Sequence, residues 1–432
     1  MPQSYQGQPG VYGTLGVPST NNTPGARSNA VSWIDGSGSL WLFGGVGYYS
    51  GGSGGQLNDL WEFNPTAKTW MWVSGANTET ANGVYGTLGT ASINNVPGGR
   101  SGAVSWVDSS GNLWLFGGDG TASSASGYLN DLWKFNPAAG EWTWMSGSSS
   151  PNVSGVYGTL GSGSASNAPG ARFGAASWTD TNGNLWLFGG YGDASGISQG
   201  DLNDLWKFSP TNGEWTWISG SNTANAGGVY GIVGASATTN IPRARDGSVS
   251  WTDSGNNLWL FGGESTASSE NGTVNDLWKF DPTNSEWTWM SGSNPNVVGV
   301  DPPSIYGSQG TPSTSNTPGG RESSISWTDG SGNLWLYGGA TIPNLETGAN
   351  LNDLWEFNPA ATTWVWVSGG STTSLSASYG TLGVPSSSDT PGARSSAVGW
   401  TDSGGSFWLF GGFAPAAPGT YGFLNDLWRY QP

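Results

Sequence analysis

The sequence contains no cysteine and no histidine, and only 12 lysine and arginine residues against 29 aspartate and glutamate residues. Without histidine or cysteine the chain cannot build a Ser-His or Cys-His nucleophile. It also cannot hold a metal through imidazole or thiolate. The net charge of −17 argues against a nucleic-acid partner, because phosphate binding needs a basic surface. No apolar run approaches the roughly 20 residues that span a bilayer, so we expect no membrane span.

What the chain has is a repeat. The phrases RSNAVSWIDGSGSLWLFGG, residues 27–45, and LNDLWEFNP, residues 57–65, return through all 432 residues with small changes. A fixed long period is typical of architectures in which each unit buries its apolar face against its neighbours. We therefore expect one domain over residues 1–432 rather than several. Each copy opens on an arginine: Arg27, Arg100, Arg172, Arg245, Arg321 and Arg394.

Each unit predicts four antiparallel strands. Residues 30–34 and 40–43 flank an Asp-Gly-Ser-Gly turn and form a hairpin, residues 57–63 form a third strand that ends before Pro65, and residues 70–73 form a fourth. Six such units predict an all-β, six-bladed β-propeller. The cores from first to third strand cover residues 27–63, 100–135, 172–208, 245–280, 321–357 and 394–430.

These residues also resemble the kelch repeat. The resemblance rests on an arginine before the first strand, a Gly-Gly pair after the second, an aromatic residue in the third and a tryptophan in the fourth, over residues 11–432. It implies a kelch propeller but no single activity, because such propellers serve as binding modules and, less often, as enzymes. The galactose-oxidase type needs histidine copper ligands and a modified cysteine, which this chain cannot supply.

The last unit ends before any Trp-x-Trp strand. Residues 1–9 are the local candidate for a closing strand, but they contain no tryptophan. Three alternatives stay open: residues 1–9 form a poor fourth strand, the sixth blade keeps an open edge, or the closing strand lies outside this sequence. An open edge could recruit a neighbouring chain.

Strand order predicts which face is functional. If the first strand is innermost, one face carries tight turns and the other carries the long loops, and binding residues concentrate on long loops. The positions that break the sixfold repeat follow the opening arginine or the Gly-Gly pair, and units four and five deviate most. The candidate binding residues are the six opening arginines together with Tyr48, Asp119, Tyr191, Arg243, Asp246, Glu264, Glu322 and Phe413.

The six arginines have two interpretations. A ring of guanidinium groups at the channel mouth would bind carboxylates. Alternatively, each arginine pairs with the aspartate of its own LNDLW phrase, and perfect sixfold repetition favours this second interpretation. Lys134, Lys207 and Lys279 each precede a glutamate by seven residues, and we expect these to form cross-strand ion pairs on exposed hairpins.

The first hypothesis is an extracellular or cell-surface binding module, rather than an enzyme, that recognises a protein or a glycan with its long-loop face. One alternative is a carboxylate-based enzyme that acts on polysaccharide. Another is a structural subunit that assembles through its edge. We expect no cofactor, and Ca²⁺ bound by oxygen ligands is the alternative that the acidic loops leave open. The Gly/Ser/Asn-rich loops are the basis for an exported, bacterial location.

Overall fold

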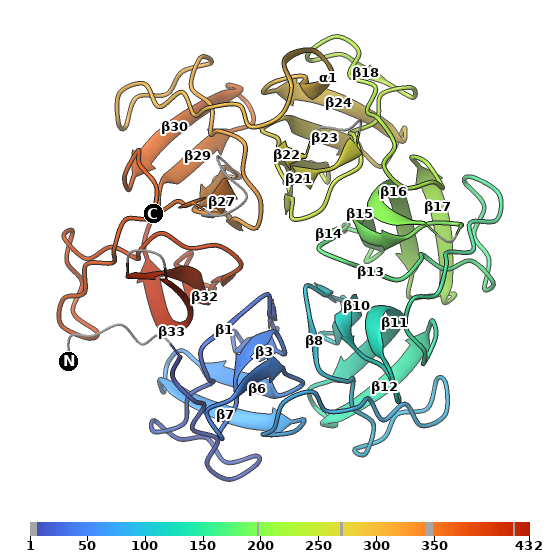
Figure 1. Ribbon diagram of the computed structural model, residues 1–432, viewed down its shortest axis with the longest axis vertical. Coiled ribbons are helices and arrows are strands. Elements are labelled where there is room, and N and C mark those ends of the chain that lie inside the picture. The colour runs from blue at the N-terminus through green and yellow to red at the C-terminus, as the bar shows by residue number, and fades with distance from the viewer. Residues whose placement is uncertain (1–6, 197, 268–270, 342–348, 418–419) are drawn as a thin grey trace.

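The computed structural model describes residues 7–196, 198–267, 271–341, 349–417 and 420–432. The blades of the propeller, each built on a β-sheet of three or more strands, surround a central channel, as Figure 1 shows. The six-bladed β-propeller predicted from the repeat is confirmed. In the described ranges, the single helix is the four-residue α1 (Pro295–Val298), so none of the described helical structure is long and apolar enough to cross a bilayer.

The innermost strands line the channel, and each alternates buried apolar residues with half-buried ones. They are β2 (Val31–Ile34), β9 (Val104–Val107), β14 (Ala176–Thr179), β19 (Val249–Thr252), β25 (Ile325–Thr328) and β31 (Val398–Thr401). Serine hydroxyls of these strands donate to the preceding blade: Ser105 Oγ donates to the Ser32 carbonyl at 3.1 Å, and Ser32 Oγ donates to the Gly399 carbonyl at 3.3 Å. The second of these bonds joins the last blade to the first.

The second and third strands form the middle of each blade. The second strands are β3 (Leu40–Phe43), β10 (Leu113–Thr121), β15 (Leu185–Asp193), β20 (Leu258–Phe261), β26 (Leu334–Tyr337) and β32 (Phe407–Ala417). The third strands are β6 (Leu60–Asn64), β11 (Ser126–Asn136), β16 (Gln199–Ser209), β23 (Leu277–Asp281), β29 (Leu354–Asn358) and β33 (Thr420–Tyr430). Both sets are mostly buried, because each sheet has a neighbouring blade on either face.

The fourth strands lie on the outside of the ring: β7 (Thr69–Ser74), β12 (Glu141–Ser146), β17 (Glu214–Ser219), β24 (Glu286–Ser291) and β30 (Thr363–Ser368). Among the described residues, blade six has only the three strands β31, β32 and β33. The alternative in which residues 1–9 complete this blade falls partly on residues 1–6, which lie outside the described residues. Residues 7–9 are in no strand.

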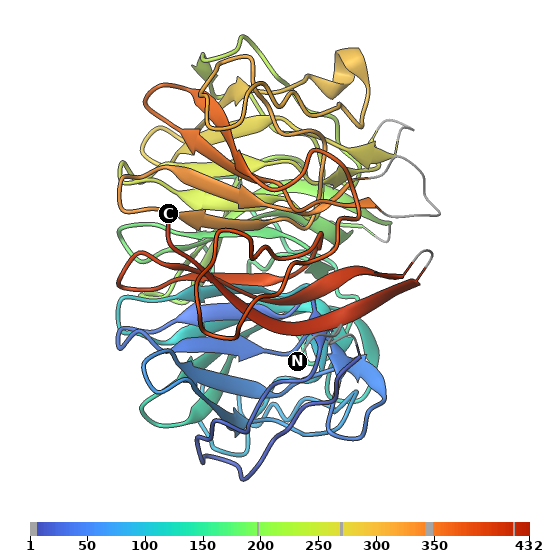
Figure 2. The same cartoon turned by 90° about the vertical axis from the view of Figure 1, so that its left-hand side faces the viewer.

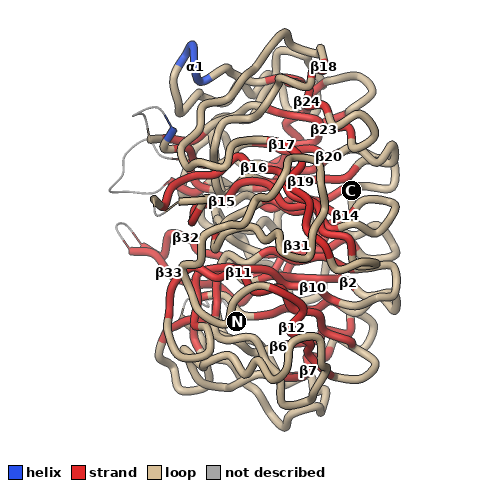
Figure 3. Tube along the Cα trace, turned by 90° about the vertical axis from the view of Figure 1, so that its right-hand side faces the viewer, coloured by secondary structure: helices blue, strands red, loops and turns tan. Residues whose placement is uncertain are grey.

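Short strands extend five of the blades at one end, and β18 (Ser236–Ala237) pairs with the outer strand β24 instead. The short strands are β1 (Arg27–Ser28), β4 (Val46–Tyr48), β5 (Gly54–Gln56), β8 (Arg100–Ser101), β13 (Arg172–Phe173), β21 (Glu264–Ser265), β22 (Gly272–Thr273), β27 (Ala340–Thr341) and β28 (Ala349–Asn350). Figures 2 and 3 show α1 and the long loops on one side of the ring and tight turns on the other.

Six clusters of buried aromatic and aliphatic side chains lie between the blades. In the cluster between blades one and two, Trp33 and Phe43 of blade one pack with Trp133 and Trp142 of blade two. The Trp33 indole donates to the Trp114 carbonyl of the next blade at 3.0 Å. The tryptophan residues therefore serve chiefly to pack neighbouring blades against one another.

The Gly-Gly pair locks neighbouring blades where the backbone turns. Gly44 and Gly45 have φ of 67° and 93°, a conformation that side chains disfavour. The Gly45 amide donates to the Arg100 carbonyl of the next blade at 2.8 Å. A Cβ on Gly45 would lie 2.6 Å from the Ser28 carbonyl oxygen. Glycine is needed here both for the turn and for the close approach.

The turn aspartates behave as predicted. The Asp35 carboxylate accepts hydrogen bonds from the amides of Ser37 and Ser39 and from the Trp41 indole at 2.8–3.1 Å. The predicted lysine–glutamate pairs are wrong, because the register places Lys134 opposite Thr143 and Glu141 opposite Asn136. Lys134 instead lies over the Trp114 ring, with Nζ 5.7 Å from the ring centroid.

Candidate functional site

The six opening arginines are structural. Each guanidinium is buried and forms a bidentate pair with the aspartate of its own LNDLW phrase: Arg27 bonds both carboxylate oxygens of Asp59 at 2.7 Å, and the side chains are 1% and 0% exposed. The equivalent pairs are Arg100–Asp131, Arg172–Asp204, Arg245–Asp276, Arg321–Asp353 and Arg394–Asp426. Burial removes these arginines from reach of a ligand, which corrects their prediction as binding residues.

A tyrosine and a tryptophan complete each ion pair. In blade one, the Tyr12 hydroxyl and the Trp61 indole donate to Asp59 Oδ2 at 2.6 and 2.7 Å. The Arg27 guanidinium also donates to the carbonyls of Gly25 and Gly44. Burial and the neighbouring Asp59 carboxylate raise the pKa of the Tyr12 hydroxyl far above its ordinary value. The network ties the long connection that carries Tyr12 to the blade's inner loop, and so fixes the loops that surround the channel.

The symmetry-breaking positions meet at the mouth of the channel. The residue after the opening arginine pairs across the sheet with the residue after the Gly-Gly pair, and this second residue pairs with the one before the Leu-Asn-Asp phrase or its variant. We name these the first, second and third mouth positions. From blade one to blade six they read Ser28–Val46–Gln56, Ser101–Asp119–Tyr128, Phe173–Tyr191–Asp201, Asp246–Glu264–Thr273, Glu322–Ala340–Asn350 and Ser395–Phe413–Phe423.

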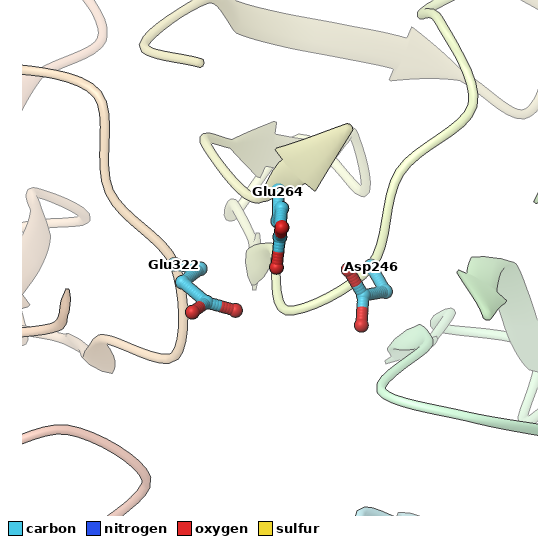
Figure 4. A group of neighbouring side chains, drawn as sticks. All are labelled: Asp246, Glu264 and Glu322. Carbon is cyan, nitrogen blue, oxygen red and sulfur yellow. The ribbon is translucent and has the colours of Figure 1, made fainter. Parts of the chain in front are cut away.

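Three predicted residues form one acidic cluster. Asp246 and Glu264 are cross-strand partners in blade four, and Glu322 comes from blade five. Figure 4 shows their carboxylates turned toward one another. One oxygen from each lies within 4.8 Å of the others. The chain separates Asp246 from Glu322 by 76 positions, so closure of the ring brings them together.

The cluster resists full ionisation. Burial, followed by repulsion from Glu264 and Asp201, raises the pKa of Glu322 to about 7. Burial and the carboxylates of Glu322, Asp201 and Glu264 raise the pKa of Asp246 well above its ordinary value. Burial and Asp201 likewise raise the pKa of Glu264. A cation at the cluster would relieve this repulsion.

Asp201, at the third mouth position of blade three, lies beside the acidic cluster, and its charge repels the cluster's carboxylates. Its carboxylate accepts hydrogen bonds from the Thr266 amide and hydroxyl at 2.5 and 2.7 Å. Arg243 is buried beside this region, where its guanidinium donates to the Ala267 carbonyl, and its charge opposes the rise that burial causes in the pKa of Asp201. Arg243 is therefore a buried residue next to the site and does not form part of its exposed surface.

An aromatic cluster adjoins the acidic one. Tyr128, Phe173 and Tyr191 lie with ring centroids 5.4–5.9 Å apart. Burial raises the pKa of the Tyr128 hydroxyl, with further contributions from Tyr191 and from the carboxylates of Asp119, Asp193 and Asp246. The Asp246 carboxylate is thus near enough to Tyr128 to act on it. One sector of the mouth, from blade two to blade five, combines carboxylates with aromatic rings.

The remaining predicted residues lie elsewhere on the mouth. Asp119 accepts a hydrogen bond from the Gln56 amide at 3.1 Å, and burial raises the pKa of its carboxyl. Tyr48 packs edge-on against Phe423 at 5.8 Å between centroids, and Phe423 packs against Phe413 at 5.6 Å. These two belong to a second aromatic group formed by blades six and one.

The set of predicted residues omitted the third mouth position. Asp201, Tyr128 and Phe423 occupy it, and each touches or acts on a predicted residue. The signal was present in the sequence, because the residue before the Leu-Asn-Asp phrase varies from blade to blade while the phrase around it repeats. Phe173, at the first mouth position of blade three, was also absent from the predicted set. It carries no charge, so it is less conspicuous than the charged residues at the same position in other blades.

The acidic cluster offers donors suited to a hard cation. Carboxylate oxygens are the ligands that Ca²⁺ prefers, and three of them make half or less of its usual six to eight. Water or a ligand's own oxygens would have to supply the rest. Soft metals are poorly matched, since the chain has neither histidine nor cysteine.

Comparison with solved structures identifies the architecture. YjhT, a kelch-repeat β-propeller protein, superposes with a TM-score of 0.56 and 15% sequence identity over 95% of this chain and 96% of that chain. The chain has the kelch-type propeller fold. No family model and no curated protein matches the sequence. Identity this low shows the fold alone, so the propeller's ligand must be argued from its own mouth residues.

Proposed function

We propose that this kelch-type propeller is a binding module whose mouth recognises a cationic group on a protein or a glycan. The observation that carries the proposal is the acidic cluster of Asp246, Glu264 and Glu322 beside the aromatic cluster of Tyr128, Phe173 and Tyr191. The opening arginines, the turn aspartates and the blade tryptophans recur from blade to blade and serve the scaffold. The departure from the repeat in one sector is what a single ligand would require.

The chemistry of the sector favours positive charge. A lysine, an arginine or an amino sugar placed among three carboxylates would allow all three to ionise, so the repulsion that raises their pKa values becomes attraction. Aromatic rings beside the carboxylates add cation–π contact and stack on the apolar faces of sugar rings. The negative charge of the whole chain would speed the approach of such a ligand.

The test compares cationic probes with neutral ones of the same size. Hexalysine, a glucosamine hexamer with its amines quaternised so that they keep their charge at every pH, and a glucose hexamer are titrated into the protein by calorimetry at pH 8 and at pH 5.5, with and without Ca²⁺. We expect one of the cationic probes to bind at pH 8 and to weaken at pH 5.5, because Glu322 takes up a proton between these values. Glu322→Gln and Glu264→Gln should weaken binding about tenfold or more.

Two results would contradict the proposal. One is equal binding of the neutral hexamer and the cationic probes, since the carboxylates would then contribute nothing. The other is unchanged binding by Glu322→Gln. Glu141→Gln, on the outer strand β12, serves as the matched control because it removes one negative charge outside the mouth. An exported location is part of the same proposal and is supported by the composition of the loops.

The second candidate is a carboxylate-based enzyme that acts on polysaccharide. It is favoured by one specific observation: Glu322, whose pKa is raised to about 7, lies beside other carboxylates at a separation below 5 Å. A protonated carboxyl beside an ionised one is the acid and nucleophile arrangement of retaining glycosidases. Release of reducing ends from amino-sugar and neutral polysaccharides tests it. Activity that survives Glu322→Gln would exclude this assignment.

A further inference from the structure

The channel through the ring narrows at the floor of the mouth, where the backbones of neighbouring blades touch. The residue two positions after each opening arginine donates its amide hydrogen to the carbonyl of the equivalent residue in the preceding blade, at 2.7–2.9 Å. These bonds form a closed circle, because the Asn29 amide donates to the Ser396 carbonyl. We name this set the backbone circle. Its members are Asn29, Gly102, Gly174, Gly247, Ser323 and Ser396.

Beyond the backbone circle the channel widens into a cavity of about 560 Å³. Three residues farther along the inner strands, a serine side chain bridges the gap between blades, as Ser105 Oγ does to the Ser32 carbonyl at 3.1 Å. The backbones therefore stand farther apart here than at the circle. The last three residues of each inner strand line the cavity and lead into the tight turns, so it lies at the tight-turn end of the channel. Its volume is within the range of about 300–1,000 Å³ that is typical of small-molecule sites.

The cavity wall has two layers of hydroxyl groups, and none of the described residues that line it is charged. The serine hydroxyls donate to carbonyls of the preceding blade, which leaves their oxygen lone pairs able to accept. The second layer consists of the last residues of four inner strands, Thr179, Thr252, Thr328 and Thr401. Thr252 donates to the Thr179 carbonyl at 3.4 Å. The hydroxyls of the other three threonines have no hydrogen-bond partner within the described part of the chain.

The inner strands also offer backbone donors to the cavity. Each inner strand is the end of its sheet, and the edge of a sheet presents unpaired N–H and C=O groups. The Ser32 carbonyl accepts the Ser105 hydroxyl of the next blade, so it faces the channel rather than strand β3. In an antiparallel ladder the amide of a residue points to the same side as its carbonyl. The Ser32 amide and its equivalents are therefore donors directed at the channel.

The cavity departs from sixfold symmetry in its side chains. Ile34 and Val107 stand in blades one and two where the other four blades have threonine. Threonine, valine and isoleucine are all β-branched and suit a strand, so folding alone does not require the four hydroxyls. Gly399 replaces the serine in blade six, and a Cβ there would lie 2.6 Å from Ile325 Cγ2. The cavity thus has one apolar wall and one wall of hydroxyl groups.

We propose that this cavity binds a neutral sugar, the size of a monosaccharide or a disaccharide, that enters from the tight-turn face. A sugar hydroxyl both donates and accepts, so it matches serine and threonine oxygens together with backbone amides. The apolar side of a sugar ring matches the wall formed by Ile34 and Val107. A charged ligand would lose its hydration without gaining a partner of opposite charge.

The cavity and the mouth are separate sites. The backbone circle lies between them, and the acidic cluster precedes it in the chain, since Asp246 and Glu322 are the residues directly before Gly247 and Ser323. The sugar proposal therefore does not depend on the cationic ligand proposed for the mouth. The two also differ in pH dependence, because none of the described residues that line the cavity titrates.

The experiment uses the full chain with glucose, galactose, mannose and maltose as neutral probes and glucuronate as a charged probe of similar size. Saturation-transfer NMR detects binding, and calorimetry at pH 8 and at pH 5.5 measures the affinity. We expect saturable one-to-one binding of at least one neutral sugar, with the same Kd at both pH values. Glucuronate should bind at least about tenfold more weakly. Hydrogen exchange should slow at the amides of Ser250 and Ser326 in the cavity wall.

Thr328→Val and Thr159→Val form the matched pair of variants. Thr328→Val removes a hydroxyl from the cavity and introduces the residue that blade two already has as Val107. It should weaken sugar binding by about two- to tenfold, as the loss of one hydrogen bond would. Thr159 is exposed on an outer connection, at the position where blade four has Ile232, so Thr159→Val should leave sugar binding unchanged.

Four results would overturn the proposal. They are the absence of binding by every neutral sugar, equal binding of glucuronate, equal effects of the two threonine variants, and sugar binding that weakens at pH 5.5. The last result would place the sugar at the acidic mouth, where Glu322 takes up a proton between these pH values.

Discussion

Replacing Glu322 by glutamine should stabilise the protein at neutral and alkaline pH. In the folded chain the pKa of Glu322 is about 7, against an ordinary value of 4.5, because burial and the carboxylates of Glu264 and Asp201 disfavour its charge. Between these two pH values the folded state binds the proton more tightly than the unfolded state. Folding stability therefore falls as the pH rises through this window. Glutamine stays neutral and removes the loss.

The magnitude follows from the same interval. A separation from 4.5 to about 7 corresponds to about 3.5 kcal/mol at about 1.4 kcal/mol per pH unit. This is a ceiling, since water in the channel screens the charge. For 432 residues, the unfolding entropy is about 0.9 kcal/mol per kelvin, so the midpoint of thermal unfolding should rise by up to about 4 °C.

The assay is thermal unfolding of wild type and Glu322→Gln from pH 4 to pH 9, followed by tryptophan fluorescence. The difference between the two midpoints should be near zero at pH 4, where the wild-type carboxyl is protonated, and should reach its maximum above pH 8. Glu141→Gln controls for loss of a negative charge on a surface strand. A difference that is independent of pH, or a destabilisation at pH 8, would refute the assignment of Glu322 to a repulsive cluster. A gain in stability that accompanies a loss of ligand binding would mark the cluster as a functional feature that folding does not need.

Two further predictions concern the scaffold and are tested by urea unfolding at pH 7. Arg172→Ala leaves the carboxylate of Asp204 buried without its bidentate partner and should destabilise the protein by about 3–5 kcal/mol. The double variant Arg172→Ala, Asp204→Ala should recover part of this loss. A loss below about 1 kcal/mol for Arg172→Ala would show that the pair is not buried as described. Tyr337→Phe introduces the residue that the other five blades have at this position, and it removes the hydroxyl that donates to the carbonyls of Pro391 and Gly392. It should destabilise the protein by about 0.5–1.5 kcal/mol. Unchanged or higher stability would mean that these hydrogen bonds contribute nothing.

The sequence by itself determined the repeat and therefore the blade. A strand pattern of period two, a turn aspartate, a Gly-Gly pair and a closing proline act within about 40 neighbouring residues, so their consequences can be read locally. The equal numbers of opening arginines and LNDLW aspartates also favoured the ion pairs that the structure contains, such as Arg27–Asp59. A side-chain pair that recurs in all six units is expected to serve the blade fold that the six units share.

Register and ring closure were decided only by the tertiary structure. Lys134 and Glu141 are seven residues apart, yet the hairpin register sets Lys134 opposite Thr143, which a count along the chain could not show. The first and second mouth positions both vary from unit to unit of the repeat, but nothing in the sequence near them indicates that they are cross-strand partners.

The meeting of Asp246, Glu264 and Glu322 depends on a rigid ring that brings blade five beside blade four. The connection tyrosines also differ from blade to blade: Tyr379 is 42% exposed, Tyr306 is half-buried, and Tyr12, Tyr85, Tyr157 and Tyr230 are buried. The repeat thus specifies each blade through strand and turn patterns that act between residues close together in the sequence. The charged sector at the mouth, in which the blades differ, arises from contacts between residues far apart in the chain.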